Sequence, residues 1–196
     1  MSRYDADDIY CYPSTNVLRN KAGITNAEEL DIYEGELSTL RSIEVLEIPI
    51  AGKFNLSHLQ DIHFVLFQDI YDWAGKIRTV DISRGNSRFA NVRFIESAAN
   101  ELFKKLSREN RLEGLNKNDL SARLAHYLSE INALHPFREG NGRVQRLFIS
   151  QLSQAAGYQL DYSDLEQEQI YEAMEVAFKG DESILASLIL DRLAKL

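Results

Sequence analysis

Residues 135–143 read His-Pro-Phe-Arg-Glu-Gly-Asn-Gly-Arg, and Arg146 follows one helical turn later. This run combines an imidazole, a carboxylate, two glycines around an asparagine, and guanidinium groups. An imidazole near neutral pH can take a proton from a hydroxyl, and a carboxylate can hold Mg²⁺. Backbone N–H groups at the start of a helix attract anions, and arginines fix phosphate oxygens. The run therefore predicts a site that holds and uses a nucleotide polyphosphate.

His135 lies at the expected end of one helix, because Pro136 prevents its simple continuation. A histidine at a helix end often does no more than satisfy a local carbonyl group. The company of Glu139, Asn141 and Arg143 favours a catalytic base instead. We therefore predict that His135 is the general base of the site.

The charged residues that follow have two interpretations each. Glu139 either pairs with a neighbouring arginine or holds Mg²⁺, since a carboxylate beside phosphate needs a divalent ion to reconcile the charges. Arg143 and Arg146 are three residues apart on one helical face, and they are either surface charges or joint phosphate ligands. The anion-binding sequence at 140–142 favours the phosphate interpretation, because it opens the same amphipathic helix.

Composition sets limits on the class of protein. The chain has 196 residues, 44% of them hydrophobic and 27% charged, with a net charge of −8. The acidic balance argues against nucleic acid as a direct partner. Cys11 is the only cysteine, which excludes a disulfide framework and fits a reducing cytosol. The start of the chain lacks an apolar signal core, and no apolar run is long enough for a membrane. We expect a cytoplasmic protein without membrane contact.

Apolar residues recur with a helical period over most of the chain, which predicts an all-α fold. Three helices are expected to begin at the capping residues Asn26, Ser57 and Asn118, the last of them ending at Leu134. Further helices are expected over residues 96–107, 141–156, 163–178 and 181–196.

One segment departs from the helical pattern. Residues 76–83 and 88–94 alternate apolar and polar side chains, and residues 84–87 between them have turn chemistry. This predicts a β-hairpin over about 77–93, packed on the helices, whose edge can pair with a strand of a partner. The alternative is a surface loop without a role.

The run from His135 to Arg146 resembles the complete signature of the Fic (filamentation induced by cAMP) domain. The resemblance extends to residues 62–63 and 72–75 before the hairpin, to 125–134, and to 157–158, so it covers nearly the whole chain. It implies a single Fic domain over 1–196, mainly helical, with the hairpin as a flap over the active site.

The activity implied by the resemblance is transfer of AMP from ATP, with Mg²⁺, to a Ser, Thr or Tyr hydroxyl of a target protein. His135 would be the general base, and Glu139 would hold Mg²⁺ against the phosphates. The implied anion hole and phosphate ligands are Gly140, Asn141, Gly142, Arg143 and Arg146, with the Asn141 side chain as an additional donor. Phe137 would anchor the loop.

Further residues are assigned by similarity of the stretches around them. The candidates for the adenine pocket are Lys53, Phe54, Ser87, Phe89 and Ala90, with loop and hairpin packing as an equally good interpretation. The candidate target-docking residues of the flap are Val80, Asp81, Ile82 and Ser83. The remaining histidines, His58, His63 and His126, sit within helical patterns and are expected to be structural.

Fic domains are typically restrained by a helix with Ser or Thr, three residues, then Glu and Gly or Asn, whose glutamate pairs with the second motif arginine. Glu34-Gly35 has the right end, but Leu30 stands where Ser or Thr is required. The resemblance therefore points to a toxin held by a separate small antitoxin that supplies the helix near Arg146. Analogy with similar toxins suggests DNA gyrase or topoisomerase IV as targets. The alternatives are a domain of a secreted, host-directed effector, a variant with another donor, and a non-catalytic binding module.

Overall fold

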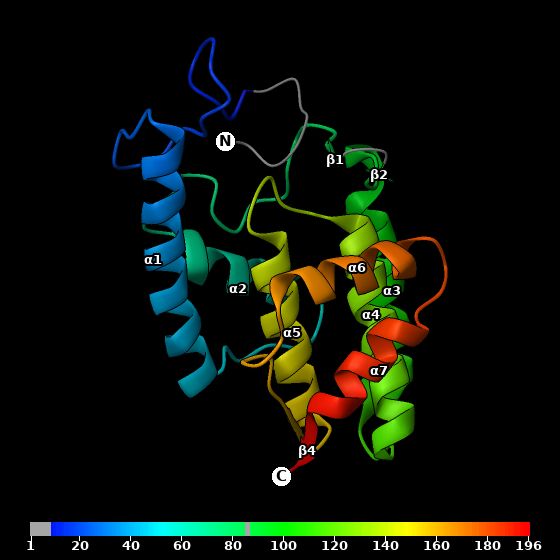
Figure 1. The fold of residues 1–196 in the computed structure, drawn as a ribbon. Coiled ribbons are helices and arrows are strands. Elements are labelled where there is room, and N and C mark those ends of the chain that lie inside the picture. The colour runs from blue at the N-terminus through cyan, green and yellow to red at the C-terminus, as the bar shows by residue number, and fades with distance from the viewer. Residues whose placement is uncertain (1–8, 85–86) are drawn as a thin grey trace.

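A computed structural model describes residues 9–84 and 87–196 of the chain, and in them most residues are helical. The helices are α1 Ala27–Glu47, α2 Leu56–Phe67, α3 Ile95–Arg108, α4 Lys117–Leu134, α5 Asn141–Ala155, α6 Gln167–Phe178 and α7 Ser183–Arg192, with short 3₁₀ turns η1 Val92–Phe94 and η2 Asn110–Leu112. Figure 1 shows α5 at the centre, with α1 and α2 on one side and α4 and α7 on the other. No helix in the described ranges has the length and hydropathy to cross a membrane.

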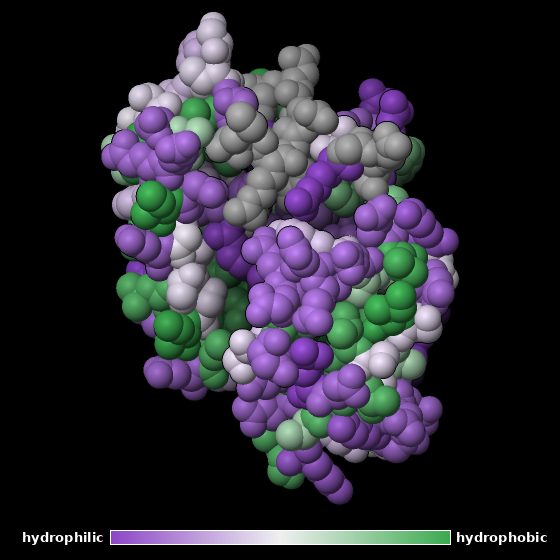
Figure 2. All heavy atoms as spheres, in the orientation of Figure 1, coloured by the Kyte–Doolittle hydropathy of each residue, from purple (hydrophilic) through white to green (hydrophobic). Residues whose placement is uncertain are grey.

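The burial of α4 and α5 in the core explains why both have apolar residues on more than one face. Both helices carry apolar side chains on several faces, and Leu124, Ile131, Phe148 and Leu152 are all completely buried. A helix that is apolar on more than one face belongs in the core. α1 contrasts with this, because its Ile32, Leu40 and Ile43 are exposed. Figure 2 shows hydrophobic side chains among polar ones along the left edge, where α1 lies.

The helix starts correct two capping assignments. Asn26 caps α1 as predicted, with its side chain accepting from the Glu29 N–H. Asn55 rather than Ser57 caps α2, and Asn116 rather than Asn118 caps α4. In each case the true cap has an extended backbone and accepts from the amide three residues on, which is the geometry that capping requires. Two nearby polar residues cannot be separated by residue type alone.

The C-terminal segment also differs from the prediction. The helix expected from residue 163 begins at Gln167, and the helix expected to reach 196 ends at Arg192. The chain continues as β4 Leu193–Lys195, which pairs antiparallel with β3 Tyr158–Leu160. Leu160 and Leu193 are both buried in this register. A helical period cannot reveal this pairing, because its partners are far apart in sequence.

The predicted hairpin is present but much shorter than its alternation suggests. Its strands are β1 Ser83–Arg84 and β2 Ser87–Arg88, which pair antiparallel, and the central turn at 85–86 lies outside the described residues. Over the rest of the predicted hairpin, side-chain hydrogen bonds take the place of hydrogen bonds between strands. Arg78 donates to the carbonyl oxygens of Val80 and Ala90, so these acceptors bind a guanidinium instead of a neighbouring strand.

Candidate active site

His135 is held in an unusual conformation at the end of α4. It is the C-cap residue, with φ 44° and ψ 61°, in the left-handed region that non-glycine residues seldom adopt. Its Nδ1 lies 2.9 Å from the carbonyl oxygen of Asn132. Because that oxygen can only accept, Nδ1 carries the hydrogen of the neutral ring, and Nε2 is the nitrogen with the lone pair.

Burial keeps this imidazole neutral. Desolvation is the main cause that lowers the pKa of His135 to about 3, and the positive charges of Arg78 and Arg84 act in the same direction. The hydrogen bond to Asn132 opposes the shift without cancelling it. A neutral ring with a defined tautomer is the form in which a histidine can accept a proton.

The flap reaches this imidazole directly. The Phe89 ring stacks on the His135 ring, with 3.7 Å between centroids and 21° between planes. The next residue, Ala90, donates its N–H to the carbonyl of Ala133 at 3.0 Å. Two of the residues predicted for the adenine pocket are thus brought to His135. Ser87 is part of the strand pair, opposite Arg84.

The loop between α4 and α5 is fastened by the side chain of Asn141. Its Oδ1 accepts from the Phe137 N–H at 2.9 Å, and its Nδ2 donates to the Phe137 carbonyl at 2.8 Å. The side chain thereby closes the turn around Gly140, a structural task in addition to the anion contact expected from the sequence. Phe137 is completely buried, as expected for an anchor.

Gly140 is required at its position for two reasons. Its φ is +79°, and a Cβ atom there would come within 2.2 Å of the Phe67 ring. The backbone of the loop therefore lies directly on α2, and it enters α5 with Gly140 as the N-cap. The Gly140 N–H donates to Glu139 Oε1 at 2.9 Å.

His63 of α2 connects a second segment to the same loop. Its Nδ1 accepts from the Gly75 N–H at 2.8 Å, so its Nε2 carries the hydrogen and donates to the carbonyl of Glu139 at 3.1 Å. Its ring stacks on Phe137 at 4.0 Å. Desolvation lowers the pKa of His63 to about 3. These contacts agree with the structural role expected for this residue.

Arg143 is held from α1, a helix to which the sequence assigned no part of the site. Its Nη1 donates to Ser38 Oγ at 2.7 Å, its Nη2 donates to Glu34, and its guanidinium lies 4.8 Å from the centre of the Phe67 ring. Tyr71 donates to the other oxygen of Glu34. Burial, followed by the charge of Glu34, raises the pKa of Tyr71, which keeps its hydroxyl a donor.

A sequence signal for this arrangement exists. Leu30, Glu34 and Ser38 follow at intervals of four residues and are all buried, so two polar residues interrupt the apolar stripe of α1. Buried polar residues need partners, and an arginine is the natural partner of a buried glutamate. The signal does not say which arginine is involved.

Arg146 lies one turn further along α5, next to the backbone of Gly142. A Cβ atom on Gly142 would come 3.4 Å from Arg146 Nη1. Tyr162, which the sequence did not single out, also faces this region. Burial raises the pKa of Tyr162 while the charge of Arg146 opposes the shift, and its buried hydroxyl has no hydrogen-bond partner within the described part of the chain.

The surroundings of Glu139 fit a magnesium ion shared with a nucleotide. The carboxylate is buried, and its Oε1 lies 4.0 Å from Arg143 Nη2. Mg²⁺ is usually bound by one or two carboxylates together with substrate phosphates and water, so a single carboxylate beside an anion-binding helix start is an adequate donor set. Among the described residues, three side chains that could together hold a metal ion lie elsewhere. They are His126 and Glu130 of α4 and Glu182 at the start of α7.

Lys53 and Phe54 are not brought to the motif loop. Lys53 is exposed, and the Phe54 ring packs against His58 and Phe148, with centroids 5.1 and 5.7 Å away. Phe148 is seven residues beyond Asn141 on α5, which is about 10 Å along the helix. Phe54 thus packs at the end of α2 remote from Gly140, and the assignment of Lys53 and Phe54 to the adenine pocket stays a prediction.

The four docking residues of the flap have mixed surroundings. Ile82 is buried, Val80 and Ser83 are half-buried, and Asp81 is exposed. Asp81 accepts from the Val92 N–H at 2.8 Å and from Asn91, which joins the two arms of the flap. Only Ser83 belongs to a strand.

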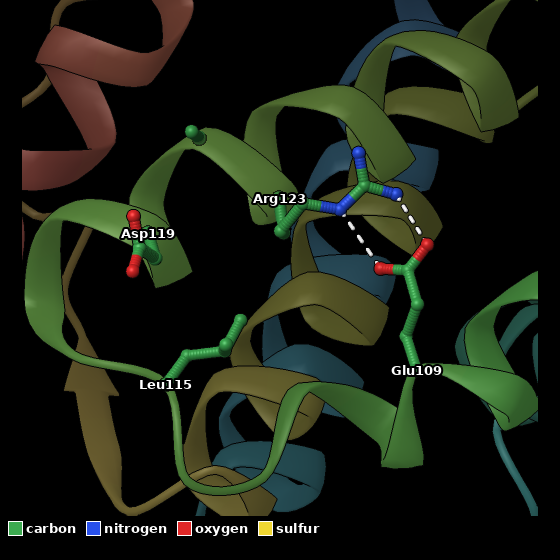
Figure 3. Close-up of a pocket in the computed structure, with 5 residues that line it drawn as sticks. Glu109, Leu115, Asp119 and Arg123 are labelled. Carbon is green, nitrogen blue, oxygen red and sulfur yellow. Dashed lines mark hydrogen bonds and ion pairs between the residues drawn. The ribbon is translucent and has the colours of Figure 1, made fainter.

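A hollow elsewhere on the surface has a different character. Figure 3 shows it between α3 and α4, lined by Glu109, Leu115, Asp119 and Arg123. Arg123 donates twice to Glu109, at 2.8 and 2.7 Å, so these two opposite charges neutralise each other and Asp119 is the remaining charge of the lining. No residue of the motif at 135–146 lines it.

Comparison with known proteins agrees with this geometry. A sequence profile described as the Fic/DOC family matches residues 53–153. The probable protein adenylyltransferase y4lH of Sinorhizobium fredii is 41% identical over 96% of this chain and 98% of its own length. The protein adenylyltransferase VbhT of Bartonella schoenbuchensis is 42% identical over 96% of this chain, which spans only 40% of that longer relative.

Solved structures show the same fold. The BepC protein of Bartonella tribocorum, a VirB-translocated effector with bound AMPPNP, superposes with a TM-score of 0.88 at 27% identity, over 95% of this chain and 97% of that one. Its mainly helical architecture matches the one described above. With a profile that covers more than half of the chain and relatives above 40% identity, the chain belongs to the Fic/DOC family.

Proposed function

We propose that this chain is a protein adenylyltransferase that moves AMP from ATP to a Ser, Thr or Tyr hydroxyl of a target protein. The observation that carries the proposal is the neutral His135, with its Nδ1 hydrogen fixed by Asn132, placed five residues before a glycine-capped helix start. This arrangement would put a general base and an anion site on one buried loop. Relatives that carry the adenylyltransferase name cover nearly the whole chain, and BepC was solved with an ATP analogue.

In the proposed reaction, Nε2 of His135 takes the proton of the incoming hydroxyl. The hydroxyl oxygen forms a bond to the α-phosphorus of ATP, the bond from that phosphorus to the β-bridging oxygen breaks, and pyrophosphate leaves. No covalent enzyme intermediate is needed. The start of α5, with the backbone of Gly140, Asn141 and Gly142, would stabilise the charge on the phosphoryl oxygens.

The charged residues of the loop would position the triphosphate. Arg143 would contact the β-phosphate region and Arg146 the γ-phosphate. Glu139 would hold Mg²⁺, which when bound neutralises charge across the phosphates. The contacts of Arg143 with α1 support its role, because a guanidinium already fixed by Glu34 and Ser38 loses little side-chain freedom when phosphate binds.

The test is transfer of label from ATP. The purified chain is incubated with Mg²⁺ and ATP labelled in the α-phosphate in a bacterial lysate, beside His135→Ala and beside the same reaction with γ-labelled ATP. We expect a protein band labelled by α-ATP alone, and only with intact His135. A band labelled by γ-ATP would show kinase-type transfer instead, and nucleotide binding without any labelled protein would favour a binding module.

We further propose that the chain acts as a toxin in the bacterial cytoplasm and is restrained by a small antitoxin. Leu30 stands where the inhibitory helix of the family pattern carries Ser or Thr, and Glu34, at the glutamate position, contacts the first motif arginine, Arg143. Expression of the chain should slow bacterial growth in a His135-dependent manner. DNA gyrase and topoisomerase IV are the first purified targets to test.

A second candidate is a role as the catalytic domain of a secreted effector. Its support is the likeness to Bartonella effector domains and the 40% coverage of the longer relative VbhT. The two roles differ in their targets. Parallel labelling in bacterial and eukaryotic lysates separates them, because an effector domain should label a eukaryotic protein, whereas a toxin should label a bacterial one.

A further inference from the structure

Arg78, in the segment that leads into the flap, is buried to an extent unusual for an arginine. Its side chain has no exposed surface. Burying a charged group costs several kcal/mol unless hydrogen bonds and opposite charge compensate, so a buried guanidinium should have a specific set of partners. The sequence analysis read this position only as one polar residue in a strand alternation.

The partners of Arg78 come from both sides of the active site. On the side of the catalytic loop, Nε donates to the His135 carbonyl at 2.8 Å and Nη2 to the Leu134 carbonyl at 3.4 Å. On the side of the flap, Nη1 donates to the Val80 carbonyl at 2.7 Å and Nη2 to the Ala90 carbonyl. One planar group therefore joins the end of α4 to both arms of the flap.

The backbone reinforces this junction. The Arg78 N–H donates to the Pro136 carbonyl at 2.9 Å, and the Ala90 N–H donates to the Ala133 carbonyl at 3.0 Å. Four consecutive carbonyl groups at the end of α4, from residue 133 to residue 136, are thus bound by the flap. The last carbonyl groups of a helix have no partner within the helix, and here the flap supplies donors for them.

The hydrogen bond from Arg78 to the His135 carbonyl is the one that concerns the transfer reaction, because His135 is the proposed base. His135 has positive φ, a conformation that a non-glycine residue keeps only when its surroundings determine it. Its carbonyl is fixed by Arg78 Nε, and its ring is fixed by Asn132 and covered by Phe89. Phe89 is in turn adjacent to Ala90, another acceptor for Arg78.

We propose that Arg78 is a positioning residue for the transfer reaction, which holds the left-handed backbone of His135 and sets the flap against it. This inference rests on the proposed function. Arg78 touches neither the nucleotide phosphates nor the acceptor in this scheme, and it acts through His135 and Phe89. A shift of about 1 Å in a catalytic group can reduce a rate about 100-fold, so loss of the guanidinium should reduce kcat. It should weaken ATP binding less than it lowers kcat, because the proposed phosphate ligands lie at the start of α5 and only the adenine candidates Ser87, Phe89 and Ala90 lie on the flap.

The test compares Arg78→Lys and Arg78→Ala with the unchanged chain, each with its kcat, its KM for ATP and its pH–rate profile. Lysine keeps the charge but cannot reproduce the planar fork. We expect kcat to fall about 10- to 100-fold in Arg78→Lys with KM for ATP changed less than about threefold. In Arg78→Ala the acidic limb of the profile should move to higher pH, because the Arg78 charge lowers the pKa of His135 and only that of Arg84 then remains. Asp81, 3.7 Å from Arg78 Nη1, loses its cation and acts in the same direction.

The matched control is Arg123→Lys. Arg123 is a less deeply buried arginine, with its side chain 34% exposed. It donates twice to Glu109 and lies over the Tyr127 ring, both outside the flap. Arg123→Lys should change the free energy of unfolding and leave kcat unchanged. Far-ultraviolet circular dichroism and thermal unfolding check that each variant is folded.

The outcomes separate the inference from the proposed function. Absence of AMP transfer by the unchanged chain, with or without His135, would remove the proposed function. An active chain in which Arg78→Lys keeps full kcat while folded would overturn the inference alone. Equal changes in kcat and in KM for ATP, or an acidic limb that stays in place in Arg78→Ala, would also overturn it and leave Arg78 as a stabilising residue only.

Discussion

Residues 134–141, in the loop between α4 and α5, are all buried, whereas the flap at 77–93 is exposed or half-buried at every described side chain except Arg78 and Ile82. The loop receives contacts from α1, α2 and the end of α4, through Arg143, His63 and Asn132 respectively. The flap has two strands of two residues each and is fastened at its base. The difference fits the proposed roles of the two segments. Catalytic groups need a fixed geometry, whereas recognition of a protein partner tolerates an adaptable edge.

The largest effect should come from the centre of the loop. His135→Ala should reduce AMP transfer to every acceptor by about 10²- to 10⁴-fold, because a general base contributes about that much. ATP binding, followed by calorimetry, should be preserved. His126→Gln is the control, because His126 pairs with Glu182 outside the site. A rate near that of the unchanged chain would mean that another residue is the base, and the loop would then not be the reactive segment in contrast to the flap.

A glycine pair tests how firmly the loop lies on α2. Gly140→Ala combines a strained φ with a clash against Phe67, and Gly114→Ala has a similar φ of +85° with no atom within 4 Å. We expect the first to lower the free energy of unfolding by about 2–4 kcal/mol and the second by about 1 kcal/mol. Urea unfolding measures both. Equal losses would mean that close packing under the loop is unimportant.

The metal dependence should also belong to the loop. Glu139→Gln keeps the size of the side chain and removes its charge, so it should shift the Mg²⁺ concentration needed for activity and lower the rate about 10- to 100-fold. Titration of the transfer reaction with Mg²⁺ gives the answer. Glu130→Gln, in the separate group with His126 and Glu182, is the control. An unchanged titration for Glu139→Gln would place the ion at other ligands.

Lowering the pH should destabilise the folded protein through the buried histidines in and beneath the loop rather than through the flap. The pKa values of His63 and His135 are both lowered to about 3, while an unfolded histidine titrates near 6.5. Between these values the unfolded chain binds more protons, so stability falls as pH decreases from about 6.5 toward 3. Each histidine contributes a slope of up to about 1.4 kcal/mol per pH unit.

Unfolding free energies at pH 7 and pH 5 measure this slope. His135→Ala should reduce it, since one buried ring with a lowered pKa is then absent, while His58 and His63 remain. A slope that remains unchanged in this variant would show that His135 is already protonated or exposed in the folded protein.

The smallest effects are expected in the flap. Val80→Thr and Ile82→Thr weaken apolar contacts of an edge that is meant to meet a target, and cross-strand contacts contribute about 0.2–1 kcal/mol each. Modification of the protein target should therefore fall about two- to fivefold, while self-modification stays nearly constant. Equal loss for both acceptors would point to folding, because Ile82 is buried, and would blur the distinction between flap and loop.

Much of the site could be predicted because its residues are close in sequence. His135, Glu139 and the glycines around Asn141 occupy one turn between two helices, so their proximity follows from the chain itself. The break at Pro136 and the helix start at Asn141 are likewise local properties. The structure places both where the residue types indicate.

The rest of the site depends on contacts between distant segments. The Arg143 guanidinium meets Glu34 and Ser38, more than a hundred residues away, and Arg78 binds the His135 carbonyl across 57 residues. The alternation around Arg78 predicted a long hairpin, yet the guanidinium took the carbonyl groups that a ladder would have used.

The sequence by itself determined the helical class, the loop between α4 and α5 and the family, because periodicity and short spacings are properties of the chain alone. Only the tertiary structure decided which buried charges are paired, how short the flap strands are, and that the chain ends in a strand against β3. The physical reason is that a charged side chain has the same sequence signature whether it faces water or a buried partner. Its environment is fixed only when the helices pack.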